Sequence, residues 1–141
     1  MRKEIKRITI KSSSGYCCVE DAYNDKLSIT ADSITYEYKP YLETEMNPAV
    51  KWSYRTNSKN FQTLFSEILK DTDSVLEYID TSFLCDVGTY VFIVTYSDKS
   101  RRTTEFSCPN EEINAYFMRI RELVPQCEDI PSVLKTSEDY E

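Results

Sequence analysis

The chain has 141 residues, with 17 basic and 24 acidic side chains that give it a net charge of −7. This length fits one domain, which removes roughly 68% of its unfolded surface from water when it folds. The 40% hydrophobic and 13% aromatic content excludes a disordered chain, and the negative charge disfavours nucleic acid and anionic lipid as partners.

The sequence carries no mark of export or of a membrane span. No segment approaches the ~18 consecutive apolar residues that a membrane helix needs, and no apolar signal run follows the basic N-terminus. The cysteine count is odd and two cysteines are adjacent, which is typical of reduced thiols. We therefore expect a soluble cytoplasmic protein. The cysteines are Cys17, Cys18, Cys85, Cys108 and Cys127.

The N-terminal residues 1–11 are locally basic, with five basic side chains against Glu4. Within them, residues 6–12 alternate Ile8 and Ile10 with polar neighbours, which predicts a strand with one buried face. We interpret the charges as the solvated entry to this strand, and a basic arm for an anionic partner is the alternative. The basic residues are Arg2, Lys3, Lys6, Arg7 and Lys11.

Three more strands are expected before the middle of the chain. Residues 27–30 and 33–38 are extended runs around a short polar link, which predicts a hairpin. The second run places Ile34, Tyr36 and Tyr38 on one face, as in an antiparallel sheet with one wet face. Residues 40–48 hold two prolines and form an irregular loop, and residues 50–55 resume as a strand.

An amphipathic helix is predicted after Asn57 and Ser58, whose side chains can cap its first turn. Its apolar residues recur at helical spacing up to a predicted end near Lys70. For residues 71–88 the pattern is ambiguous, and we predict a short strand over residues 75–79 followed by a loop. The apolar residues of the helix are Phe61, Leu64, Phe65, Ile68 and Leu69.

Residues 90–96 are almost all apolar or aromatic, which predicts a central strand covered on both faces. A polar turn over residues 97–100 would pair Tyr96 with Arg101, so that Val94 faces Thr103 on the return strand. Lys99, Arg101 and Arg102 are interpreted as charges that keep this aggregation-prone hairpin soluble. The alternative is a surface that grips an acidic partner.

A second amphipathic helix is predicted between Asn110, which can cap it, and Pro125, which ends it. Its apolar stripe would contribute on the order of 10–15 kcal/mol by buried area, an upper estimate. The helix therefore belongs to the core. The stripe consists of Ile113, Tyr116, Phe117, Ile120, Leu123 and Val124.

The order of these elements predicts an α+β fold, with an antiparallel sheet of about five to six strands and two amphipathic helices against one face. A partly closed β-barrel capped by the C-terminal helix is the alternative. We expect a single domain over residues 1–136 and a frayed acidic tail over residues 137–141.

Several kinds of catalytic site are excluded by composition. The sequence has no histidine, which removes Ser–His and Cys–His nucleophile pairs and imidazole metal sites. Gly15 and Gly88 are its two glycines, too few for a glycine-rich phosphate loop. Neither the cysteine spacing nor the carboxylates at Asp71 and Asp73 match a zinc or calcium motif. We therefore predict no catalytic residue, no metal site and no cofactor.

Two groups of side chains, three cysteines and three aromatic residues, could have a chemical or ligand-binding role. The adjacent Cys17 and Cys18 resemble a reactive pair, and Cys108 precedes a predicted helix N-terminus, where a thiol pKa is lowered. We interpret all three as ordinary thiols. Tyr90 and Phe92 share one strand face with Tyr96, as stacking aromatics do in some RNA-binding sheets, but we interpret them as core residues.

The hypothesis that fits these exclusions is a small non-enzymatic domain that binds another macromolecule, with a protein as the expected partner. Tyr38, Tyr41 and Met46 are the predicted contacts, because they lie in or beside the irregular loop and tyrosine is favoured at binding hot spots. Nucleic acid and membrane are not expected partners, and the sequence leaves the oligomeric state open. One alternative is an acidic decoy that inhibits a nucleic-acid-binding protein, and another is a carboxylate- and metal-dependent enzyme.

Overall fold

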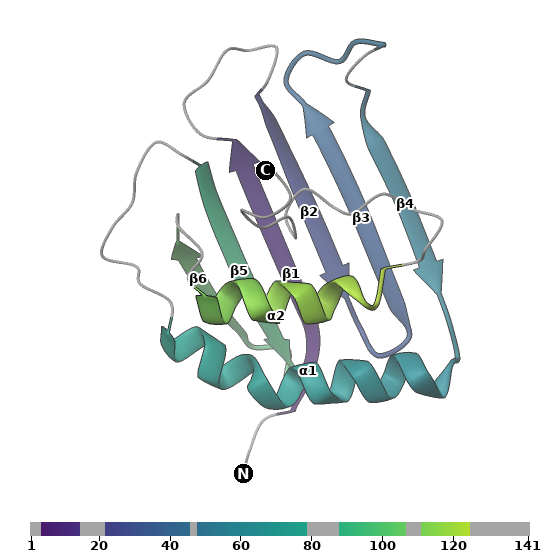
Figure 1. Ribbon diagram of the computed structural model, residues 1–141, viewed down its shortest axis with the longest axis vertical. Helices are drawn as coiled ribbons and strands as arrows, with labels where there is room; N and C mark the ends of the chain where they lie inside the picture. The colour runs from purple at the N-terminus through teal and green to yellow at the C-terminus, as the bar shows by residue number, and fades with distance from the viewer. Residues whose placement is uncertain (1–3, 15–21, 46–47, 79–87, 107–110, 125–141) are drawn as a thin grey trace.

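The computed structural model describes residues 4–14, 22–45, 48–78, 88–106 and 111–124. Within these residues six strands form one antiparallel sheet in the order β4-β3-β2-β1-β5-β6, and two helices lie across one of its faces (Figure 1). The predicted α+β fold is confirmed. The elements are β1 (Ile5–Ser14), β2 (Tyr23–Ile29), β3 (Ser33–Pro40), β4 (Val50–Arg55), α1 (Lys59–Tyr78), β5 (Gly88–Tyr96), β6 (Arg101–Phe106) and α2 (Glu111–Arg121).

The sheet is open rather than closed on itself. Strands β4 and β6 form its opposite edges, so the alternative of a partly closed barrel is wrong (Figure 1). The predicted hairpin of β2 and β3 is confirmed, with Ile29 opposite Ile34 beside the link. The predicted strand over residues 50–55 is β4, which pairs with β3 as the outermost strand of its side.

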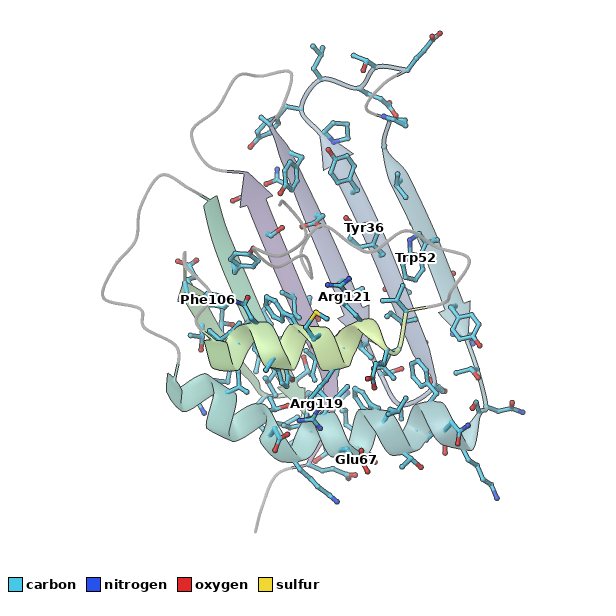
Figure 2. All side chains as sticks on the ribbon, in the orientation of Figure 1. Tyr36, Trp52, Glu67, Phe106, Arg119 and Arg121 are labelled. Carbon is cyan, nitrogen blue, oxygen red and sulfur yellow. The ribbon has the colours of Figure 1, made fainter. Side chains whose placement is uncertain are left out.

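The core lies between the sheet and the two helices. Alternate residues of each strand point toward the helices, and Ile8, Leu27 and Ile34 are fully buried there. Tyr36 and Trp52 lie side by side on β3 and β4, with ring centroids 5.8 Å apart (Figure 2). At the other side of the sheet, Phe106 stacks on Tyr90 at 5.1 Å.

Helix α1 is longer than the sequence pattern predicted. It begins after Ser58, whose Oγ accepts a hydrogen bond from the backbone N–H of Phe61 at 3.4 Å, and it runs to Tyr78. The prediction of a strand over residues 75–79 is therefore wrong. The helix continues because the buried positions keep helical spacing through Thr72 and Val75, although a threonine interrupts the apolar stripe.

Helix α2 confirms the predicted C-terminal helix and its apolar stripe. Ile113, Tyr116, Phe117 and Ile120 are all buried against the sheet and α1. The hydroxyls of Tyr116 and Thr72 lie 2.8 Å apart, so a buried hydrogen bond joins the two helices. Arg119 forms an ion pair with Asp71 of α1 at the surface, and Figure 2 shows it between the helices.

The hairpin of β5 and β6 is shifted by one residue from the predicted register. Tyr96 N–H donates to the Ser100 carbonyl at 2.9 Å, so the loop has three residues rather than the four that we predicted. Its last residue, Lys99, has φ 72°, the left-handed conformation usual at the end of such loops. Val94 consequently pairs with Arg102, not with Thr103.

A one-residue shift moves every side chain of β6 to the other face of the sheet. Phe106 therefore reaches the helix-covered core, where it is 1% exposed. Arg101 and Glu105 point to the opposite face. On that face Val91 and Ile93 of β5 are only half-buried, so the prediction that this strand is covered on both faces is wrong.

Candidate functional site

The face of the sheet away from the helices is built from polar and charged side chains. Two transverse rows can be read from the strand register, because residues that pair across strands point to the same side. One row, which we call the hydroxyl row, has a serine or threonine on every strand except β5, where Ile93 stands. In strand order from β4 to β6 it holds Ser53, Thr35, Ser28, Thr9, Ile93 and Thr103. A charged row, two residues further along each strand, holds Lys51, Glu37, Lys26, Lys11, Val91 and Glu105.

This surface, which we call the open face, is strongly basic although the chain is acidic. Each of its basic side chains is exposed, and they come from every strand except β5. In the described part of the chain the open face carries seven basic and two acidic side chains. They are Arg7, Lys11, Lys26, Lys39, Lys51, Arg55 and Arg101, against Glu37 and Glu105.

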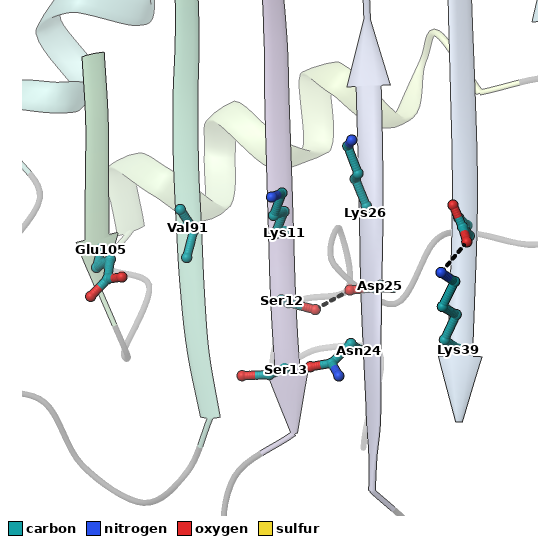
Figure 3. Close-up of a pocket in the computed structure, with 10 residues that line it drawn as sticks. Lys11, Ser12, Ser13, Asn24, Asp25, Lys26, Lys39, Val91 and Glu105 are labelled. Atoms are coloured by element: carbon teal, nitrogen blue, oxygen red, sulfur yellow. Dashed lines mark hydrogen bonds and ion pairs between the residues drawn. The ribbon is translucent and has the colours of Figure 1, made fainter. Parts of the chain in front are cut away.

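Two hollows lie side by side on the open face and share Lys26 and Glu37. One has a volume of about 450 Å³ and reaches from Lys39 across β1 to Glu105. Figure 3 shows it from the open face, with Lys11 and Lys26 on neighbouring strands and α2 behind the sheet. The other, about 610 Å³, extends from Arg7 to Lys51 and includes part of the hydroxyl row. The face is therefore hollowed over its basic centre.

Glu37 is compensated by the lysines around it. Its Oε1 lies 2.8 Å from Lys39 Nζ, the ion pair marked by the dashed line beside Lys39 in Figure 3. The hydrogen bond from Lys39 lowers the pKa of Glu37, and the positive charges of Lys39, Lys51 and Lys26 act in the same direction, against partial burial. Glu37 is therefore ionised at neutral pH, and its negative charge offsets part of the positive charge of the neighbouring lysines.

Arg7 links the cations to the hydroxyl row. Its guanidinium donates a hydrogen bond of 3.3 Å to Ser28 Oγ on the neighbouring strand. Thr9 and Ser28 are almost fully covered by the longer side chains around them, at 7% and 6% exposure. Hydroxyls under a layer of cations can donate to the oxygens of an anionic group that reaches them.

The residues predicted as contacts lie elsewhere. Tyr38 points to the helix-covered face, where it stacks on Tyr23 with ring centroids 5.3 Å apart. Tyr41 follows the end of β3 and is 66% exposed, with its backbone N–H bonded to the Ala22 carbonyl at 2.9 Å. Met46 lies outside the described residues. The structure therefore separates Tyr38 and Tyr41 from the basic centre of the open face, and their role stays a prediction.

The other features that the sequence singled out are placed as follows. All five cysteines lie outside the described residues. Phe92 is 1% exposed and Tyr90 packs on Phe106 and Phe117, so these aromatics belong to the core and not to a stacking surface. Among the residues that the structure describes, no three acidic or cysteine side chains gather closely enough to hold a metal ion.

Two parts of the site escaped sequence reasoning. The basic centre joins Lys11, which the sequence analysis grouped with the basic N-terminal residues, to Lys26 and Lys51, which it did not single out. Their signal was alternation with apolar residues, which places them on the wet face of a strand. Asp25 was also missed: it is 4% exposed, on the helix-covered face, and it accepts hydrogen bonds from Ser12 and Tyr36. This buried carboxylate is fixed within the sheet.

Comparison with known proteins gives no relative: no protein-family model, no curated protein and no solved structure matches the chain. In the described residues, neither helix is both long enough and apolar enough to cross a membrane.

Proposed function

We propose that this chain is a non-enzymatic protein-binding domain whose open face docks an acidic surface of a partner protein. The observation that carries this proposal is the charge of the open face. Seven of its nine described charged side chains are basic, on a chain whose net charge is −7. A patch of opposite sign to the rest of the molecule orients a partner during encounter and selects for complementary charge.

The shape of the open face supports docking of a folded partner. It spans six strands, so its width is about 24 Å at the usual spacing between strands. Thr9 and Ser28 of the hydroxyl row are covered by longer side chains, and Thr35, Ser53 and Thr103 are exposed, so the row gives a partner hydrogen-bond donors and acceptors as well as charge. Val91 and Ile93 add a small apolar area beside Lys11 and Thr9.

A protein is a better fit than nucleic acid for two reasons. Glu37 and Glu105 lie within the charged row and would repel closely spaced phosphates. The strand register places none of the described aromatic side chains on the open face, because Tyr36 and Trp52, which border the second hollow, point to the helix-covered core; unpaired bases would have no ring on which to stack. Tyr41, exposed beyond the end of β3, remains a predicted contact of the same partner, and the exposed Leu42 beside it adds apolar area.

The test compares charge reversal on the two sides of the molecule. In one variant of the full chain, Lys26→Glu and Lys51→Glu reverse the open face. In the matched control, Lys59→Glu and Lys70→Glu change the net charge equally on the exposed side of α1. Each protein is immobilised, incubated with nuclease-treated extract of the source cells, and the bound proteins are quantified by mass spectrometry.

We expect the wild type and the α1 control to retain acidic proteins that the open-face variant does not retain. Their recovery falls as NaCl rises from about 50 mM to about 300 mM, because exposed charges are screened over shorter distances. Equal recovery by all three proteins would contradict the proposal. Recovery of a strongly basic protein by the wild type and by the open-face variant would instead favour the acidic-decoy hypothesis.

A further inference from the structure

Two lysines of the open face stand directly opposite each other. Lys11 of β1 pairs with Lys26 of β2 in the strand register, and both side chains are exposed (Figure 3). Like charges in this position repel, because the Cβ atoms of directly paired residues are about 5 Å apart. Neither ammonium group takes part in any of the ion pairs or hydrogen bonds found among the described side chains.

The nearest carboxylates of the open face offset the charge of this pair only in part. Glu37 lies opposite Lys26 but forms its close ion pair with Lys39, at 2.8 Å. Glu105 lies on β6, beyond β5, and is therefore two strand spacings or about 10 Å from Lys11. The structure therefore concentrates two positive charges at the centre of the face without a carboxylate between them.

The lysine pair also borders a space that an anionic side chain can enter. The hollow of about 450 Å³ is lined by Lys11 and Lys26 together with Ser13 and Asn24, which pair with each other on β1 and β2. The hydroxyl and the amide can donate hydrogen bonds next to the two ammonium groups. Glu37 and Glu105 line the same hollow, which favours a single small anionic group over a continuous row of charges.

We propose that Lys11 and Lys26 together form a carboxylate-binding site, which anchors a Glu or Asp side chain of the partner protein. This inference rests on the proposed function, because it places the central contact of the docked partner. An incoming carboxylate bridges the two ammonium groups and removes their mutual repulsion. It gains charge-assisted hydrogen bonds that lysines elsewhere on the face, with no second lysine opposite, cannot supply together.

The experiment uses the full chain and, as the probe, a fluorescein-labelled peptide with one glutamate among neutral residues, with binding followed by fluorescence anisotropy at low salt. The anchor variant carries Lys11→Gln and Lys26→Gln. A second variant carries Lys51→Gln and Arg55→Gln, at the β4 edge of the same face. The matched control carries Lys59→Gln and Lys70→Gln on α1, and all three lose two positive charges at exposed positions.

We expect the anchor variant to bind the peptide about tenfold more weakly than the wild type. The β4-edge variant should lose less, and the α1 control should change less than about twofold. In the wild type labelled with ¹⁵N-lysine, the peptide should shift the side-chain signals of Lys11 and Lys26 before those of Lys51. A melting temperature that is no lower than that of the wild type confirms for each variant that the fold is intact.

The failures of the two proposals give different results. Equal weakening by the anchor and β4-edge variants would overturn the lysine anchor and leave the basic docking face in place. Equal binding by the wild type and both open-face variants would overturn both. A third result would be that a DNA duplex binds more tightly than the peptide at the same salt and that the anchor variant loses this binding. It would show that the site binds phosphate rather than carboxylate. Displacement of the peptide by millimolar glutarate alone would mean that the site takes a free carboxylate rather than a docked surface.

Discussion

The hydroxyl of Tyr36 on β3 donates a hydrogen bond of 2.8 Å to the buried carboxylate of Asp25 on β2. Ser12 on β1 donates to the other oxygen of the same carboxylate, so three neighbouring strands meet at one buried group. A carboxylate that is 4% exposed is stable only while such donors satisfy it. This cluster therefore fixes the pairing of the strands that carry Lys11 and Lys26 on the opposite face.

Replacing Tyr36 by phenylalanine should destabilise the fold by about 1–3 kcal/mol, because it removes a hydrogen-bond donor from a buried carboxylate. Urea unfolding followed by circular dichroism measures the change in free energy. Tyr41→Phe is the matched control, since Tyr41 is 66% exposed and its loss of a hydroxyl should change stability little. Equal stability of the two variants would show that the Tyr36 hydroxyl is not needed.

The buried hydrogen bond between the helices gives a second stability test. Thr72 Oγ1 lies 2.8 Å from the Tyr116 hydroxyl and 2.9 Å from the Ile68 carbonyl. Thr72→Val keeps the shape and removes these contacts, which should cost about 1 kcal/mol. Thermal unfolding of Thr72→Val is compared with that of Thr63→Val, at an exposed position of the same helix. If both variants melt at the same temperature, the buried bond contributes nothing measurable.

The ion pair of Glu37 and Lys39 predicts a change of pKa. Lys39→Met removes the first cause of the lowered pKa, so the Glu37 pKa should rise toward its ordinary value. A ¹³C NMR titration of the side-chain carboxyl measures it. Lys70→Met on α1 is the control and should leave the Glu37 titration unchanged.

The sign of the linked stability change follows from the direction of that shift. Because the folded pKa of Glu37 is lowered, its contribution to stability is present above the ordinary pKa and disappears as pH falls through the lowered value. Lys39→Met should therefore lower stability at neutral pH and make no difference in strong acid. A difference between the variant and the wild type that grows on acidification would contradict this assignment.

The turn between β5 and β6 predicts a stabilising substitution. Lys99 has φ 72°, which costs most residues roughly 1 kcal/mol and asparagine less. Lys99→Asn should therefore stabilise the chain by about 0.5 kcal/mol, and Lys99→Val should destabilise it by about 1 kcal/mol or more. Chemical denaturation of the two variants checks the opposite signs. Stabilisation by valine would mean that the turn tolerates a branched residue and that its register differs.

Much of the fold could be predicted because it depends on local patterns. The alternation of Ile34 and Tyr36 with polar residues identified β3, and the spacing of Ile113, Tyr116 and Ile120 identified α2. Local patterns were insufficient where one residue broke the rule. Thr72 interrupted the apolar stripe of α1, and its hydroxyl is satisfied by Tyr116, a residue 44 positions later in the chain. A partner so far away in the chain cannot be identified from a short segment of sequence.

The β5–β6 register shows that an error of one residue in loop length reverses the orientation of every side chain on a strand. The sequence analysis predicted a turn of four residues where the structure has three, and the loop length decides which face receives Phe106. The buried stacking of Phe106 on Tyr90 favours the three-residue loop. The contacts predicted at Tyr38, Tyr41 and Met46 were chosen from a loop pattern, and they remain predictions.

By itself, the sequence determined the α+β class, the acidic net charge and the wet sides of β1 and β3, because these follow from composition and from alternation along one segment. Only the tertiary structure decided that the wet sides of six strands form one basic face. Lys11, Lys26 and Lys51 belong to three different strands, and their charges act together only because backbone pairing sets those strands in register. Their joint effect is therefore a property of the assembled sheet and not of any one segment.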